Sequence, residues 1–188
     1  MITRVGLTFA AALALWLGIG YSAAQRACAH DPRFVCSPRS AAHAVRIPDA
    51  SKSWAYYGGL TPDQSDEFAF GLSRPTVLSW SLLVDARDAA TPARPAAALF
   101  DAQGSVIAGV NFAGGGSAFY EPFSRESYLQ SSVKHLNLWP GSYSIVVSMS
   151  GAAARQRYVM AIGDAERFSP FEIPYVAGAI ARIRARRY

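Results

Sequence analysis

The sequence predicts an all-β protein: an antiparallel, jelly-roll-like β-sandwich of about eight strands, with a hydrophobic helix before it and a short amphipathic basic helix after it. Three observations lead to this fold class. Apolar and polar residues alternate in short runs, which is the period of half-buried strands. Turn residues separate these runs, and no apolar repeat of helical period occurs before residue 170. The 188 residues, 51% of them hydrophobic, suffice for one domain with appendages.

The first 24 residues predict a membrane-targeting segment. Residues 5–24 carry no charge and follow Arg4. At about 1.5 Å per residue they would span about 30 Å as a helix, the thickness of the hydrocarbon layer, so the segment could remain as a signal anchor. Ser22 and Ala24 are also suitable for cleavage of a signal peptide before Gln25. Both alternatives predict an exported protein on the periplasmic or cell-surface side of a membrane.

Residues 25–51 are rich in Pro, Ser, Ala and His without any period, so we expect a tether. Within it, seven residues separate Cys28 from Cys36. In an oxidising compartment these cysteines would close a disulfide loop worth about 2–3 kcal/mol. The alternative is metal binding with His30 and Asp31, although structural zinc requires four close ligands.

The strand pattern of the sandwich runs through residues 52–168. Apolar runs of strand length occur at 54–57, 68–72, 78–84, 97–100, 106–110, 136–138, 143–149 and 158–162. A glycine-containing turn at 101–104 predicts a hairpin, and Pro140 followed by Gly141 suits a type II turn.

The stretch 113–130 interrupts this rhythm and predicts a long loop. Three consecutive glycines at 114–116 lead into residues that mix aromatic and charged side chains. Long loops on sandwiches often bind ligands, so we expect the binding site in loop 118–129. Its candidate contact residues are Phe119, Tyr120, Glu121, Phe123, Arg125 and Tyr128. In the alternative interpretation, Phe119, Tyr120 and Phe123 close the open end of the sandwich as a lid on its core.

Residues 169–188 predict the C-terminal helix, with Pro174 in its first turn. Its apolar stripe consists of Ile173, Val176, Ile180 and Ile183. The stripe is too short to span a bilayer. An interfacial helix would place four arginines at lipid phosphates, namely Arg182, Arg184, Arg186 and Arg187. The alternative is a helix packed on its own domain with a solvated basic tail.

The charge distribution argues against nucleic acid as a partner. The net charge is +5, with 18 Lys and Arg against 13 Asp and Glu. The excess lies in Arg4 and in the four C-terminal arginines, so residues 25–181 are formally neutral. A nucleic-acid-binding domain instead spreads its basic residues over a folded face.

No catalytic constellation stands out, and we expect no cofactor. A hydrolytic triad would have to combine His135 with a nearby serine, Ser131 or Ser132, and with Glu121 or Glu126. No Gly-x-Ser-x-Gly motif supports such a triad.

A turn with three acidic residues provides weak candidates for a calcium site. These residues are Asp63, Asp66 and Glu67. Calcium prefers such oxygen ligands, whereas an acidic turn that leads into a strand usually faces solvent.

Several segments look like an uncharacterised family of exported bacterial and archaeal β-sandwich proteins. They are residues 55–60, 66–70, 119–123, 140–147 and 158–168. The order of features also resembles the pre-peptidase C-terminal sandwich domains, with an acidic turn into Phe-x-Phe, a glycine-turn hairpin and a final tyrosine-rich strand. The resemblance covers residues 52–175 and implies an accessory, binding or surface role. The sequence departs from those modules because no protease or other catalytic region accompanies it.

The sequence therefore favours a non-catalytic, exported and membrane-associated accessory or binding module. We expect it to contact an envelope protein or a glycan through loop 118–129. The alternative is a hydrolase of unrecognised type that uses His135.

Overall fold

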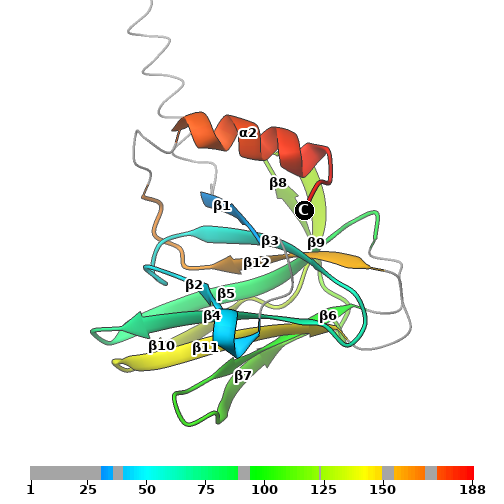
Figure 1. Ribbon diagram of the computed structural model, residues 1–188. Helices are drawn as coiled ribbons and strands as arrows, with labels where there is room; N and C mark the ends of the chain where they lie inside the picture. Colours follow the sequence, from blue (N-terminus) through cyan, green and yellow to red (C-terminus); the bar gives the residue numbers. More distant parts are fainter. Residues whose placement is uncertain (1–30, 36–39, 89–93, 123, 150–154, 168–172) are drawn as a thin grey trace, which may run out of the picture.

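The computed structural model describes residues 31–35, 40–88, 94–122, 124–149, 155–167 and 173–188. These residues form two packed sheets and one short C-terminal helix (Figure 1), so the predicted sandwich is confirmed. The predicted hydrophobic helix of residues 1–24, both cysteines and Phe123 lie outside the described residues. Within the described ranges, no helix has the length and apolar character needed to cross a bilayer.

The larger sheet has seven strands, six of which follow one another across it. They are β1 (Asp31–Phe34), β3 (Trp54–Leu60), β12 (Gln156–Ile162), β5 (Thr76–Asp85), β9 (Glu126–Gln130) and β8 (Ser117–Glu121). The seventh strand, β10 (Lys134–Leu138), pairs with the first half of β5, and β9 pairs with the second half. Between β9 and β10, the buried Ser131 accepts a hydrogen bond from the Leu82 N–H at its hydroxyl, 3.0 Å away.

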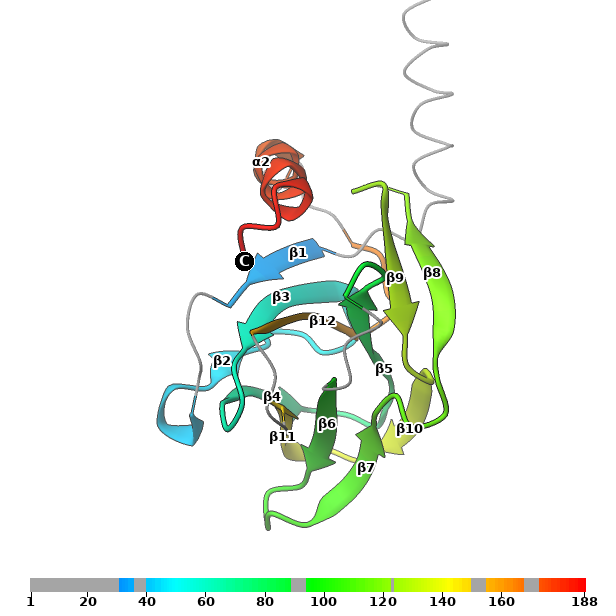
Figure 2. The same cartoon turned by 90° about the vertical axis from the view of Figure 1, so that its right-hand side faces the viewer.

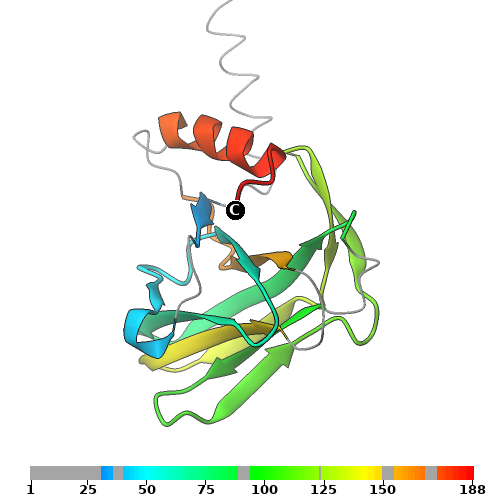
Figure 3. The same cartoon turned by 45° about the vertical axis from the view of Figure 1, so that its right-hand side comes forward.

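The smaller sheet has five strands. Their order is β2 (Val45–Arg46), β4 (Ser65–Leu72), β11 (Gly141–Met149), β6 (Pro95–Phe100) and β7 (Val106–Val110). A single turn of 3-10 helix, Ala41–His43, precedes β2. The consecutive strands β3, β4, β5 and β6 alternate between the two sheets, so the chain crosses repeatedly from one layer to the other (Figures 2 and 3).

The space between the sheets is filled by the alternating residues of the predicted runs. Leu78, Trp80, Leu82 and Val84 point inward from β5, because every second side chain of a strand lies on the same face. They meet inward-facing residues of the smaller sheet such as Phe68, Leu99, Ile145 and Val147. We call this cluster the inner core.

The described residues contain twelve strands rather than about eight. The four additional strands are β1, β2, β8 and β9. The first two lie in the predicted tether 25–51, which is therefore wrong for residues 31–34 and 45–46. Both pair in parallel, β1 with β3 and β2 with β4, so the sandwich is not purely antiparallel. Strands of four and two residues are too short to show alternation, and long-range pairing decides their conformation.

The C-terminal helix, α2 (Ile173–Arg184), lies over the outer face of the seven-stranded sheet (Figure 1). Ala179 and Ile183 are buried there, and Val176 and Ile180 also face the sheet. Val176, Ile180 and Ile183 of the apolar stripe therefore pack on the domain itself. This agrees with the alternative interpretation, in which the helix covers its own domain.

Candidate functional site

The predicted binding loop 118–129 is a β-hairpin, made of β8 and β9, and not a long loop. In its register Phe119 is opposite Tyr128, and Glu121 is opposite Glu126. Aromatic side chains that face each other across two strands stabilise such a pair. The hairpin stands at the edge of the seven-stranded sheet beside α2 (Figure 2).

Strand alternation divides the candidate contact residues between the two faces of the hairpin. Phe119, Glu121 and Tyr128 face α2, and Tyr128 is only 3% exposed. Tyr120 points to the opposite face and is 58% exposed. Arg125 is exposed at the turn, where it has a positive φ of 56°. Phe119 packs on buried residues beneath α2, on the outer face of the larger sheet and not over the open end of the sandwich, and Tyr120 is exposed, so neither residue is the expected lid on the core between the sheets.

The residues beneath α2 form a second hydrophobic cluster, which we call the outer core. It contains Ala55, Tyr57, Leu83, Tyr128, Val159, Ala161, Ile183 and Tyr188, with Phe34 and Phe119 packed against them. The ring of Tyr57 meets that of Tyr188 edge-on, with 5.1 Å between centroids. The ring of Phe34 lies 5.7 Å from that of Tyr57. Strand β1, the hairpin and the C-terminal end of α2 thus converge on one tyrosine-rich cluster.

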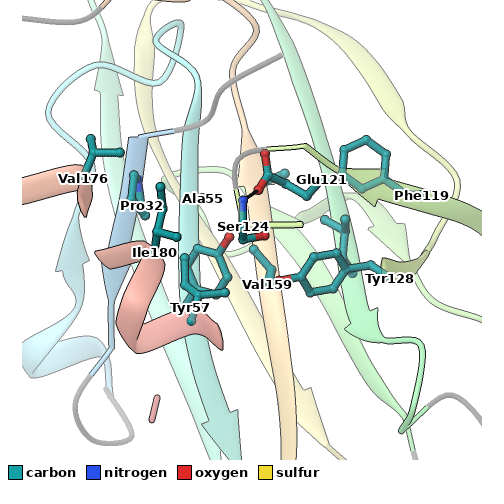
Figure 4. Close-up of a pocket in the computed structure, with 13 residues that line it drawn as sticks. Pro32, Ala55, Tyr57, Phe119, Glu121, Ser124, Tyr128, Val159, Val176 and Ile180 are labelled. Atoms are coloured by element: carbon teal, nitrogen blue, oxygen red, sulfur yellow. Dashed lines mark hydrogen bonds between the residues drawn. The ribbon is translucent and has the colours of Figure 1, made fainter. Parts of the chain in front are cut away.

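A cavity of about 40 Å³ remains within the outer core (Figure 4). Its lining is mainly apolar, with Tyr57, Glu121, Ser124 and Tyr128 as polar members. The buried Glu121 carboxylate accepts a hydrogen bond from the Ser124 N–H at 2.6 Å, which ties the turn of the hairpin to β8. The volume suffices for buried water but is far below the roughly 300 Å³ of small-molecule sites.

The tyrosines of the outer core resist ionisation. Burial raises the pKa of Tyr57 and of Tyr128 well above the ordinary value, and nearby Tyr188 and Glu121 add to the effect. Burial likewise raises the pKa of Tyr188 to about 12. These phenols are therefore neutral hydroxyl groups at physiological pH.

Charged residues surround the outer core at the end of β5. Arg87 donates from Nε and Nη2 to the two carboxylate oxygens of Asp85, at 2.9 and 2.8 Å, and its Nη2 also reaches Glu126 at 2.7 Å. Burial by itself would raise the pKa of Asp85, but the hydrogen bonds from Arg87 and the charge of Arg186 lower it overall. Asp85 is thus held as a carboxylate.

Three of the four arginines expected at a membrane surface contact the domain itself. Arg186 lies 2.6 Å from Asp88 and 3.3 Å from Asp85. Arg184 donates from Nε to the carbonyl oxygen of Ser124 at 2.8 Å. The guanidinium of Arg182 lies 4.1 Å from the ring centroid of Phe34. Each of these three arginines therefore has an intramolecular contact, and their binding to lipid phosphates stays a prediction.

The structure does not assemble the residues of the alternative hydrolase. His135 is exposed on β10 opposite Ser79, whereas Tyr128 is opposite Asp85, six residues further along β5. At about 3.3 Å per residue these positions are about 20 Å apart, and the pair Glu121 and Glu126 lies beyond Tyr128. The hydroxyl of Ser131, another candidate, accepts the Leu82 N–H inside the sheet.

The acidic turn does not form a calcium site. Asp66 is buried, and its Oδ2 accepts a hydrogen bond from the Tyr158 hydroxyl at 2.6 Å. Glu67 follows directly on the same strand and therefore points to the other face. In the part of the chain that the structure describes, no three His, Cys, Asp or Glu residues are grouped as metal ligands.

Comparison with known proteins gives likenesses among solved structures only. No family model matches the sequence, and no curated protein does. The structure is similar to the crystal structure of the pre-peptidase C-terminal domain of a collagenase from Bacillus anthracis, at 14% identity and a TM-score of 0.42. The match covers 68% of this chain and 99% of that domain. This is the class of sandwich that the sequence resembles, and the likeness carries no argument about activity.

The sequence analysis missed the charged residues at the edge of the outer core, which we call the rim: Asp85, Arg87, Asp88, Arg157 and Arg186. The available signal was the group of three charges, Asp85, Arg87 and Asp88, at the end of a long apolar run. Their partners Arg157 and Arg186 lie far away in sequence, at separations of 69 and 98 residues from Asp88. Only the folded chain identifies such pairs.

Proposed function

We propose that this chain is an exported, jelly-roll-like accessory module without catalytic activity, which binds another component of the cell envelope. Residues 1–24 would deliver it across the membrane as a signal peptide or anchor. In the oxidising compartment beyond, Cys28 and Cys36 would form the predicted disulfide. The partner would be an envelope protein or a glycan, and the hairpin of β8 and β9 would contact it.

The observation that carries this proposal is the open edge at β8. Among the described strands, β8 pairs only with β9. Proteins usually protect such edges with charged residues or proline, because unpaired backbone groups invite another strand. Residues 117–120 have neither, and Tyr120 is 58% exposed beside this edge.

An extended segment of a partner protein fits this edge better than a glycan does. The segment would add a strand to the seven-stranded sheet through backbone hydrogen bonds, and Tyr120 would supply apolar contact area. The hydrolase alternative receives less support, because His135 lies about 20 Å from Tyr128 along β5, and Glu121 and Glu126 lie beyond Tyr128.

A cross-linking pull-down from membranes tests this proposal. Ala118→Lys and Tyr120→Arg place charge on the open edge and should abolish the cross-linked product without lowering the melting temperature, since both side chains are exposed. The matched control is Val106→Arg on β7, the edge of the other sheet, where the side chain is 64% exposed. Wild-type levels of the product in both β8 variants would refute the proposal.

A further inference from the structure

A hollow lined by five arginines lies where the end of α2 meets the start of β12. Its volume is about 350 Å³, within the range of ligand pockets. The lining residues are Val35, Arg155, Arg157, Arg182, Arg186, Arg187 and Tyr188. All of its charged side chains are therefore guanidinium groups, and we call it the arginine pocket.

The end of α2 positions three of these arginines through its backbone. The Arg186 N–H donates to the carbonyl oxygen of Ile183 at 2.8 Å, and the Arg187 N–H donates to that of Arg182 at 3.1 Å. This pattern is the Schellman motif, in which glycine normally occupies the position of Arg186 because φ is positive there. Arg186 adopts a φ of 53°. This conformation is strained for any residue other than glycine, and the contacts of the Arg186 side chain with Asp85 and Asp88 offset the strain.

Asp88 orients two of the guanidinium groups. Its Oδ2 accepts hydrogen bonds from Arg157 at 3.1 Å and from Arg186 at 2.6 Å. The Nε atom of Arg157 is also buried, and it has no hydrogen-bond acceptor among the described residues. One carboxylate thus aligns two donors without satisfying all of their N–H groups.

The guanidinium group of Arg155 packs against Gly59 of β3. A Cβ atom at position 59 would come within 2.7 Å of Arg155 Nε and 2.8 Å of its Nη2. The guanidinium therefore rests against the backbone of β3 at Gly59. Within the described ranges, neither Arg155 nor Arg187 has an acidic partner.

Among the described residues, the arginine side chains of the pocket outnumber the acidic side chains that reach them. Arginine stays protonated in proteins, so the five groups cannot relieve their repulsion by losing protons. The carboxylates that reach them are Asp85 and Asp88, and Asp85 is shared with Arg87. The negative end of the helix dipole adds only about half a charge. An anion bound in the pocket would complete this balance.

We propose that the arginine pocket binds a phosphate group carried by an ester. The planar guanidinium fork matches phosphate oxygens through paired, charge-assisted hydrogen bonds, and a tetrahedral dianion can accept from several such donors at once. Arg155 and Arg187, which have no acidic partner among the described residues, would contact the phosphate directly, while Asp88 holds Arg157 and Arg186 in place for the same anion. This site is independent of the open edge at β8.

Calorimetric titration of the full chain in nonionic detergent, at low ionic strength, tests the proposal with inorganic phosphate and pyrophosphate as probes. Arg155→Gln and Arg187→Gln should each raise the Kd for pyrophosphate about tenfold or more, because each removes a charge-assisted pair. Arg155→Lys should recover only part of the loss, since an ammonium group lacks the fork. The matched control is Arg74→Gln. Arg74 is exposed and lies just before the first residue of β5, at the end of that strand away from Asp85, so its loss should change the Kd less than about twofold.

Two further ligands distinguish the sources of the phosphate. Tighter binding of a short-chain phosphatidylglycerol than of glycerol phosphate would assign a lipid headgroup, and the reverse order would assign a soluble phosphate ester. Whichever of the two ligands binds more tightly, the result supports the site if Arg155→Gln weakens the binding of that ligand. The proposal is overturned if no probe binds at millimolar concentration, or if Arg74→Gln weakens binding as much as the pocket variants do.

Discussion

The two faces of the seven-stranded sheet bury different kinds of core. On the inner face, large side chains such as Trp80, Leu82 and Met160 are at most 1% exposed beneath the second sheet. On the outer face, Tyr57, Tyr128 and Tyr188 remain 3–8% exposed beneath a single helix, and a cavity of about 40 Å³ lies among them. A second sheet covers the whole pleated surface, whereas one helix covers only a strip of it.

This difference shows how each core is held in place. The inner core depends on apolar area, which two facing sheets remove from water along their whole length. The outer core is smaller and is enclosed by ion pairs at the rim, where Arg186 meets Asp85 and Asp88. We therefore expect α2 to open in local fluctuations while the two sheets stay folded.

The largest effect should come from the inner core. Phe68→Ala removes a fully buried ring that meets Tyr56 edge-on, with 5.2 Å between centroids. We expect a loss of about 3–5 kcal/mol in the free energy of unfolding, from lost burial and from the cavity left behind. Urea denaturation should show this loss over the whole molecule. A loss confined to α2 would contradict the distinction between the cores.

Ile183→Ala should weaken the outer core by about 2 kcal/mol, the lower end of the range for buried aliphatic residues, because a helix can adjust over the cavity. Hydrogen exchange should accelerate in residues 173–184 and stay unchanged in β4 and β11. Ile183→Val is the matched control and should cost about 1 kcal/mol. Equal acceleration in both sheets would show that the two cores unfold as one.

Acid should loosen the outer core before the inner one. The pKa of Asp85 is lower in the folded protein, so its contribution to stability is present above the ordinary pKa of about 3.9 and is lost as the pH falls through the folded value. Hydrogen exchange of α2 between pH 5 and pH 3, as an approximate range, measures this loss.

Asp85→Asn should remove this acid dependence, while Asp49→Asn should leave it intact. The pKa of Asp49 is also lowered, chiefly by the Ser51 hydroxyl, but the side chain of Asp49 contacts Ser51 and Arg167 and not a residue of α2 among the described pairs. Acid sensitivity of α2 that persists in Asp85→Asn would refute the role of the rim.

The smallest effect concerns the end of α2. Arg186→Ala and Arg186→Gly both remove the ion pairs to Asp85 and Asp88, but only glycine relieves the positive φ. The glycine variant should therefore be more stable than the alanine variant by about 1 kcal/mol, measured by urea denaturation. Equal stabilities would show that the φ of Arg186 is not strained.

The sequence by itself determined the sandwich and its inner core. Alternation is a local property, since side chains two residues apart share a face, so Leu78, Trp80 and Leu82 identify a buried face without knowledge of its partner. The helical spacing of the apolar residues predicted α2 for the same reason. That spacing could not show whether the stripe of Val176, Ile180 and Ile183 would contact lipid or protein, because both surfaces are apolar.

The tertiary structure alone decided the outer core, the hairpin and the arginine pocket. The outer core draws one or two residues from each of several distant segments, such as Phe34, Tyr57, Tyr128 and Tyr188, and no segment carries a pattern of its own. Likewise, Arg155 reaches the C-terminal arginines only because β12 begins beside the end of α2. Contacts between segments far apart in sequence follow from chain topology, and topology is a property of the whole fold.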